Sequence, residues 1–178
     1  MASLFGKHSL LEQAALLDTA LMLPKIQIIK TWWHDYHHGS LKTDKETSRE
    51  QQYNQDVFMR VLGYTEKPAA NHTFEPKAST STGQLPDAIV GCLSTNSALS
   101  SVNAVVELKG AKVDLDRPQQ GAGNLSPVQQ AFKYRPQYRG CSFVIVSNFY
   151  EFRLYHDNQL DYERWTLDEL VDPKNDYV

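Results

Sequence analysis

Two carboxylates, a lysine and a glutamine are spaced along residues 86–134 in a pattern that could support metal-dependent hydrolysis of a phosphate ester. Asp87 precedes the apolar run 88–90, Glu107 and Lys109 close a second apolar run, and Gln130 lies in a later helical segment. Because side chains alternate along a strand, Glu107 and Lys109 share one face. If the two strands pair, Asp87 comes beside Glu107, and two adjacent carboxylates favour a cation between them.

The cation that suits these ligands is Mg²⁺, which binds oxygen atoms octahedrally and keeps several waters. We expect Asp87, Glu107 and the backbone carbonyl of Leu108 to hold it, with Mn²⁺ able to substitute. Lys109 would contact the attacking water and the scissile phosphate, where its charge offsets developing negative charge. A simpler alternative stays open, in which Asp87 caps a turn after Pro86 and Lys109 forms only a salt bridge with Glu107.

Three further side chains could support this site. The Gln130 amide can donate to a phosphate while accepting from a neighbour. Tyr134 lies one helical turn further on the same face, where it could equally well pack on the sheet. Glu50, near the start of an earlier helix, is a candidate outer-shell acid that orients water, although Glu46 and Asp56 compete for that position.

These residues resemble the PD-(D/E)XK nuclease pattern. The resemblance is carried by three elements, namely Asp87, the run Glu107-Leu108-Lys109 and the run Gln130-Ala131-Phe132-Lys133-Tyr134. The last matches the Q-x-x-x-Y element of part of that superfamily. A wider stretch, roughly residues 46–156, is similar to the N-terminal nuclease region of single-chain type IIG restriction-modification enzymes, whereas residues 1–40 carry none of the pattern.

The resemblance implies a Mg²⁺-dependent endonuclease acting on double-stranded DNA within a restriction-modification system. It also implies methyltransferase and target-recognition regions in a longer parent chain, and it leaves open a dimer for double-strand cleavage. The alternative is a nuclease-like fold that no longer cuts and serves as a DNA-binding or assembly module. A third possibility is a metal-binding protein unrelated to DNA.

Composition and charge limit the remaining choices. A net charge of −3 argues against a protein that grips nucleic acid over its whole surface. From residue 109 to residue 139, however, six cations face two anions, an excess of +4 beside the candidate site. Candidate contacts to a DNA backbone in this segment are Lys112, Arg117, Lys133 and Arg135.

The chain lacks the signals of export and of membrane insertion. No apolar run approaches the length of a membrane helix, and the N-terminus lacks the pattern of a secretory signal. Cys92 and Cys141 stand apart without Cys-x-x-Cys spacing, so we expect a reduced, cytoplasmic protein with two buried thiols.

The order of the predicted helices and strands indicates an α/β domain in which helices flank a central mixed β-sheet. The resemblance further implies that this domain is a restriction-endonuclease-like core. We expect an N-terminal helical extension over residues 1–45 and a nuclease core over residues 46–178. The predicted helices cover residues 9–22, a segment from Pro24 through Tyr36, residues 48–62, residues 128–136 and a short segment after Thr166. The predicted strands cover residues 72–75, 87–92, 103–109, 142–147 and 150–155. The predicted loops and turns cover residues 39–47, 65–84, 94–101 and 116–127, and the strand 72–75 lies within the second of them.

A histidine cluster over residues 34–38 suggests a second metal site. His34 and His38 are four residues apart, which places both imidazoles on one helix face, and His37 lies between them. No third ligand follows at a supporting spacing. We therefore favour a polar helix end, where such side chains complement the C-terminal dipole.

Overall fold

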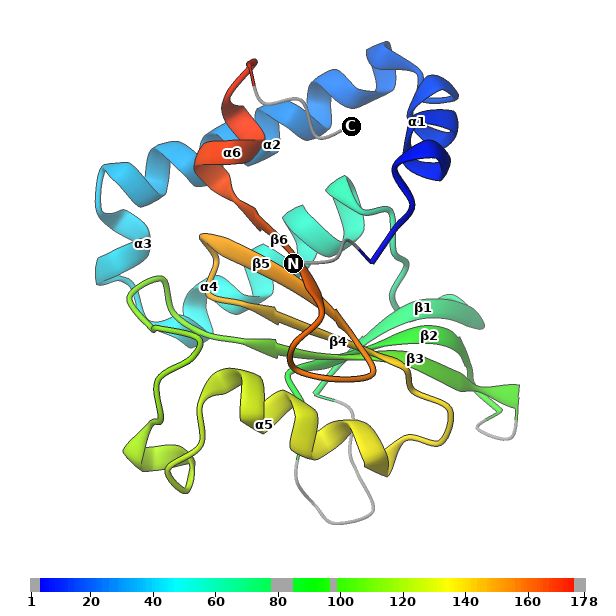
Figure 1. The fold of residues 1–178 in the computed structure, drawn as a ribbon, viewed down its shortest axis with the longest axis vertical. Coiled ribbons are helices and arrows are strands. Elements are labelled where there is room, and N and C mark those ends of the chain that lie inside the picture. The colour runs from blue at the N-terminus through cyan, green and yellow to red at the C-terminus, as the bar shows by residue number, and fades with distance from the viewer. Residues whose placement is uncertain (1–3, 78–84, 97–98, 175–178) are drawn as a thin grey trace.

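The computed structural model describes residues 4–77, 85–96 and 99–174, and it has one sheet with helices on both faces (Figure 1). The helices are α1 (Lys7–Ala15), α2 (Thr19–His37), α3 (Ser40–Thr43), α4 (Glu46–Tyr53), the π-helical η1 (Asn54–Val61), the short 3-10 turns η3 (Gln120–Ala122) and η4 (Arg135–Gln137), α5 (Pro127–Tyr134) and α6 (Leu167–Val171). The strands are β1 (Asn71–Pro76), β2 (Ala88–Ser94), β3 (Ser101–Leu108), β4 (Phe143–Ser147), β5 (Glu151–His156) and β6 (Tyr162–Thr166).

The six strands follow one another across the sheet in sequence order. Every neighbouring pair is antiparallel except β3 and β4, which run parallel. A parallel pair needs a crossover connection, and α5 lies within it. The sheet is therefore mixed, and the predicted α/β class with a central mixed sheet flanked by helices is confirmed at this level.

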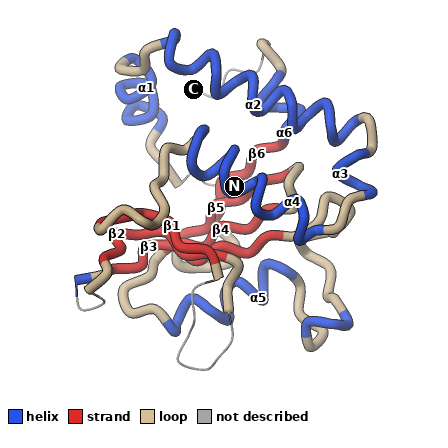
Figure 2. The backbone as a smooth tube through the Cα atoms, turned by 180° about the vertical axis from the view of Figure 1, so that it is seen from behind, coloured by secondary structure: helices blue, strands red, loops and turns tan. Residues whose placement is uncertain are grey.

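The two faces of the sheet carry different cores. Figure 2 shows α5 on one face and α2 with α4 and η1 on the other. Along β3, Val106 and Leu108 belong to the core beneath α2 and α4, whereas Val105 belongs to the core beneath α5. Strand alternation therefore assigns Glu107, which follows Val106, to the α5 face.

Two of the N-terminal helices, α2 and α3, contribute side chains to the core over one face of the sheet. Trp32 of α2 and Leu41 of α3 are each 2% exposed and pack in the same cluster as Tyr53, Phe58 and Phe149. Trp32 meets Tyr53 edge to face, with ring centroids 5.1 Å apart, a preferred aromatic geometry. Helices α2 and α3 thus form part of the cover over this face of the sheet.

Several element boundaries differ from the sequence prediction. The first break falls at Leu16–Asp18 instead of near residue 23, because the Asp18 side chain caps α2 by accepting from the Ala20 N–H (2.8 Å). As a result, α2 runs through Pro24. The predicted loop 39–47 contains α3 and the start of α4, and the predicted loop 116–127 contains η3.

The sequence prediction missed one strand, β6, which pairs with β5 at the edge of the sheet. Its residues include Glu163 and Arg164, and charge of this kind is common on edge strands because it discourages pairing with other chains. Apart from the boundary between the first two helices, the predicted strands and helices are present with ends that shift by up to two residues. Residues 78–84 of the predicted loop 65–84 and residues 97–98 of the predicted turn lie outside the described part of the chain.

Two smaller predictions can be compared directly. Cys141 is buried as expected, but Cys92, near the end of β2, is exposed and belongs to neither core cluster. None of the helices in the described residues combines the length and apolar character needed to cross a membrane.

Candidate active site

The pairing of β2 with β3 brings the two predicted carboxylates together. Ala88 lies opposite Val106 in the antiparallel register, so Asp87 lies beside Glu107 at the end of the pair. The backbone N–H of Leu108 donates to Oδ2 of Asp87 at 2.7 Å. Asp87 is therefore held by the strand that carries Glu107, as the sequence predicts.

Glu107 and Lys109 form the buried part of the site. Glu107 is 3% exposed, and its Oε1 lies 2.5 Å from the Nζ of Lys109. Burial raises the pKa of Glu107 to about 7, and the negative charge of Asp87 contributes in the same direction, against the opposing effect of Lys109. Burial disfavours the charge of Lys109, but the surrounding carboxylates outweigh this and raise its pKa. Lys109 is consequently protonated at neutral pH.

Helix α4 adds two acidic residues to this end of the sheet. Glu46 and Glu50 are four residues apart and share one helix face. Oε2 of Glu46 accepts from the Gly110 N–H at 2.6 Å, and its negative charge also favours protonation of Glu107. Glu50 is 9% exposed and pairs with Lys77. Asp56, the other competing acid, binds the indole N–H of Trp32 instead (3.2 Å).

Lys77 links two of these carboxylates. Its Nζ lies 2.7 Å from Oε1 of Glu50 and 2.7 Å from Oδ1 of Asp87. Burial disfavours its charge, but its hydrogen bonds to Asp87 and Glu50 prevail and raise its pKa. When every group is ionised, four carboxylates face the ammonium groups of Lys77 and Lys109, so the group carries a net charge of −2. The four carboxylates belong to Glu46, Glu50, Asp87 and Glu107.

The α5 residues lie on the same face as Glu107. Gln130 is 8% exposed, and its amide donates to the carbonyl oxygen of Leu125 (3.4 Å). Burial raises the pKa of Tyr134, and the charges of Glu107 and Asp87 raise it further. Tyr134 therefore lies within the field of the carboxylates while it also packs on the core beneath α5.

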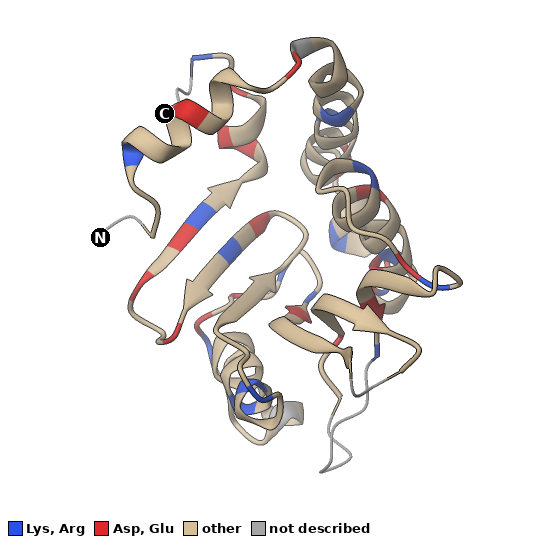
Figure 3. Ribbon diagram, turned by 90° about the vertical axis from the view of Figure 1, so that its right-hand side faces the viewer, with Lys and Arg blue, Asp and Glu red and all other residues tan. Residues whose placement is uncertain are grey.

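The four residues predicted to contact the DNA backbone differ in their exposure and in their contacts with other side chains. Cations gather on α5 and the turn that follows it (Figure 3). Lys112 and Lys133 are exposed, and Arg117 pairs with Asp114 at 3.2 Å. Arg135 instead donates to the Cys141 carbonyl and to Asp157, which ties η4 to the end of β5.

The histidines of α2 do not converge on a shared point. His34 and His38 stack with ring centroids 3.7 Å apart, and His38 Nδ1 bonds the His34 carbonyl (2.9 Å). His37 lies 2.7 Å from Asp168 of α6. Across residues 4–77, 85–96 and 99–174, no three His, Cys, Asp or Glu side chains are arranged around one point as metal ligands.

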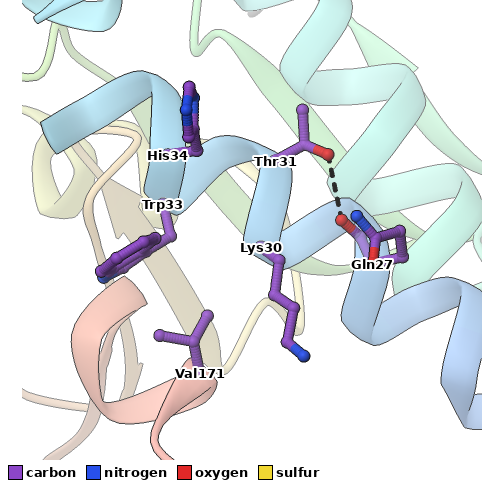
Figure 4. Close-up of a pocket in the computed structure, with 6 residues that line it drawn as sticks. All are labelled: Gln27, Lys30, Thr31, Trp33, His34 and Val171. Carbon is purple, nitrogen blue, oxygen red and sulfur yellow. Dashed lines mark hydrogen bonds between the residues drawn. The ribbon is translucent and has the colours of Figure 1, made fainter. Parts of the chain in front are cut away.

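One cavity in the described part of the chain lies away from the carboxylates. It has a volume of about 620 Å³ and lies between α2 and α6. Figure 4 shows Lys30, Trp33 and His34 of α2 beside Val171 of α6 along its wall, with the Thr31 hydroxyl donating to the Gln27 carbonyl (3.0 Å). Apart from His34, it contains no residue that the sequence predicts as functional.

The donor set at Asp87 and Glu107 fits Mg²⁺ by its chemistry. Mg²⁺ is typically held by one or two carboxylates together with waters, and two such carboxylates lie side by side here. The pKa of Glu107 is raised because burial and the negative charge of the neighbouring Asp87 both disfavour its ionised form. A bound divalent cation would supply the two positive charges that the group lacks.

Sequence reasoning did not find Lys77 and gave Glu46 only as a competitor of Glu50. A four-residue spacing could have paired Glu46 with Glu50 on one helix face. No comparable signal exists for Lys77, because its two partners lie 27 residues before it and ten residues after it and meet only in the folded sheet.

Comparison of the chain with protein-family models, with curated proteins and with solved structures found no match. The functional reading of this site therefore rests on its geometry and on the motif resemblance.

Proposed function

We propose that the chain is a Mg²⁺-dependent endonuclease domain with a restriction-endonuclease-like core, which hydrolyses phosphodiester bonds of duplex DNA. The observation that supports this function best is the position of Asp87 beside Glu107, with the Lys109 ammonium 2.5 Å from Glu107. Two carboxylates and one protonated lysine at the ends of paired strands are the groups needed to hold a cation and receive a phosphate.

Each residue has a role that follows from its surroundings. Asp87, Glu107 and the Leu108 carbonyl would hold Mg²⁺, which supplies positive charge to the phosphate oxygens when it is bound. Lys109 is protonated, so it acts as a fixed cation that donates to a phosphate oxygen and not as a base. The Leu108 N–H keeps Asp87 oriented.

The approach of DNA is proposed from the placement of cations. Lys112 follows the site in sequence, and Lys133 lies on α5, which covers the same face of the sheet. Both are exposed and available to phosphate groups, together with Arg117. A role in restriction-modification, with methyltransferase and target-recognition regions in a longer chain, rests on the motif resemblance alone.

Metal-dependent cleavage of plasmid DNA tests the proposal. We expect the protein to nick supercoiled plasmid with Mg²⁺ or Mn²⁺ and to stop when EDTA is added. Asp87→Ala and Glu107→Ala should each abolish cleavage and cation binding measured by calorimetry, while Lys30→Ala, an exposed α2 position, should leave both unchanged.

Two other outcomes would overturn this function. DNA binding without cleavage at any cation concentration would favour the inactive module that binds or assembles on DNA. Cation binding without any affinity for DNA would favour a metal-binding protein of another kind.

A further inference from the structure

Lys77 occupies an unusual place at the end of β1. Its backbone has φ +52°, a left-handed conformation that residues other than glycine adopt only rarely. Its N–H donates to the Asp87 carbonyl oxygen (2.8 Å), and its Nζ reaches the Asp87 carboxylate and Glu50 at 2.7 Å each. Main chain and side chain of Lys77 are thus both fastened to Asp87.

Both carboxylate oxygens of Asp87 are engaged in this arrangement. Oδ2 accepts from the Leu108 N–H, which belongs to the strand framework, and Oδ1 accepts from Lys77. A divalent cation on Oδ1 would bring two positive groups onto one oxygen atom, where they repel each other strongly. The Leu108 contact is fixed by strand pairing, so Lys77 is the group that can leave.

The Lys77 side chain is suited to leaving. It is 53% exposed, whereas the side chains of Glu50 and Asp87 are only 12% and 18% exposed. Its flexible stem can carry the ammonium into water, while the two carboxylates stay on α4 and at the head of β2. Once Lys77 has left, Glu50 and Asp87 both need another cation.

From this geometry, and resting on the proposed function, we infer that Lys77 holds the place of a divalent cation between Asp87 and Glu50. Cation binding displaces the Lys77 ammonium, and Glu50 then joins Asp87 and Glu107 in balancing the cation's charge. The displaced ammonium remains tethered beside the site, where it meets the phosphate of an incoming nucleic acid. Lys77 is therefore a positioning residue that keeps the carboxylates in place until the cation arrives.

Calorimetric titration of the whole chain with Mn²⁺ tests this inference without relying on cleavage. Lys77→Met removes the competing charge and should bind Mn²⁺ on the order of tenfold more tightly than the wild type. Lys77→Arg keeps the charge and should stay within about twofold of the wild type. The matched control is Lys67→Met, because the Lys67 side chain is similarly exposed (55%) and pairs with Glu75 of β1 at 3.0 Å.

Glu50→Gln identifies the second partner. In the Glu50→Gln background, the gain from Lys77→Met should shrink to roughly threefold or less, because one of the two carboxylates that Lys77 neutralises is gone. Urea unfolding gives an independent readout. In EDTA, Lys77→Met should unfold at a lower urea concentration than the wild type, since Asp87 and Glu50 are left without a cation, and saturating Mn²⁺ should remove that difference.

The possible failures point to different errors. If the wild type binds Mn²⁺ and Lys77→Met binds it equally or more weakly, Lys77 does not compete and this inference is wrong, while the proposed function stands. If neither protein binds Mn²⁺ or Mg²⁺, the cation site itself is wrong and both proposals fall. A gain in affinity that is equal in Lys67→Met would also overturn the inference, because it would reflect net charge alone.

Discussion

Glu107 shows how burial and a neighbouring charge act together on one side chain. Its carboxylate is almost fully buried at the end of an apolar strand, and a single ammonium neutralises it in the presence of Asp87. A buried charge of this kind is costly unless it is fully paired. The free energy of unfolding should therefore depend on the protonation of Glu107 whenever no divalent cation is present.

The sign of that dependence follows from the raised pKa of Glu107. Protons bind the folded state more tightly than the unfolded state, whose pKa is near the ordinary value of 4.5. The stabilising contribution is present below pH 4.5 and is lost as the pH rises through about 7. In EDTA, the free energy of unfolding of the wild type should fall by about 3 kcal/mol as the pH rises through this range, and Glu107→Gln should remove that fall.

Urea unfolding at a series of pH values measures this effect. Glu66→Gln, at a position away from the site, serves as the control and should keep the pH dependence of the wild type. An equal slope in the wild type and in Glu107→Gln would show that Glu107 ionises normally.

Lys109 should separate cation binding from catalysis. Lys109→Ala should still bind Mn²⁺, because Asp87 and Glu107 remain, but lose cleavage by roughly 100-fold or more, as expected when one preorganised donor to the reacting group is removed. Lys109→Arg should also cleave poorly, because a planar guanidinium does not replace a compact ammonium in a crowded site. Plasmid nicking and calorimetry on the same preparations provide the measurement, and unaltered nicking by Lys109→Ala would place the lysine outside the reaction.

Local contacts made the centre of the site predictable from the sequence. Asp87, Glu107 and Lys109 lie on or beside two strands joined by a short connection, so strand alternation and antiparallel pairing suffice to bring them together. Glu46 meets Gly110 across 64 residues of sequence, and Lys77 meets Glu50 from another element. Such contacts depend on how α4 packs against the sheet, which periodicity does not determine.

At the scale of elements, predictions were confirmed where the local sequence pattern is clear and were missed where that pattern is masked or outweighed by packing. Strands with apolar alternation were found, and the final helix was found from its capping box, in which Thr166 and Glu169 exchange hydrogen bonds. Strand β6 was missed because its charged residues mask the alternation. The path of α2 through Pro24 was missed because packing of its later turns outweighs the lost backbone hydrogen bond.

The junction between α2, β5 and α6 depends on one acidic side chain. Asp168 accepts from Trp33 (2.7 Å), contacts His37 (2.7 Å) and accepts from Tyr150 (2.6 Å). The bond from Tyr150 is the largest of the effects that lower the pKa of Asp168, ahead of those of His37 and Trp33. Asp168 therefore fastens the N-terminal helices to the end of the sheet.

Asp168→Ala should lower the free energy of unfolding by roughly 1–2 kcal/mol, less than three separate hydrogen bonds would give, because the side chain is half exposed. The contribution is present above the ordinary pKa of 3.8 and is lost as the pH falls through the lowered value. Urea unfolding at pH 7 and pH 3 checks both statements. Asp161→Ala, an exposed acid whose side chain bonds its neighbour Asn158, should change little at either pH.

The whole molecule carries a net negative charge with a local cationic segment, and under the proposed function this charge distribution determines how it binds DNA. Only a few cations near the site are exposed, and Arg135 is engaged by Asp157. Repulsion between the remaining negative surface and the phosphate backbone opposes binding. Affinity should therefore be weak and independent of sequence, since contacts to phosphates carry no base information.

The salt dependence of binding gives a number for this expectation. Neutralising two to four phosphates predicts a slope of about −2 to −4 in a plot of log affinity against log salt concentration. Fluorescence anisotropy with two unrelated duplexes measures this slope. The Lys109→Ala variant is used with Mg²⁺, so that the DNA is not cleaved during the titration. A single protected sequence in a footprint at physiological salt would contradict the prediction and would show that the chain reads bases by itself.

The single parallel pair in the sheet has a consequence for how the molecule is assembled. It divides the six strands into two meanders, β1 to β3 and β4 to β6, each built from neighbouring segments of the chain. Asp87, Glu107 and Lys77 all belong to the first meander, so their mutual spacing does not depend on how the second meander is set. A substitution that shifts β5 or β6 should therefore leave the spacing of these three side chains unchanged.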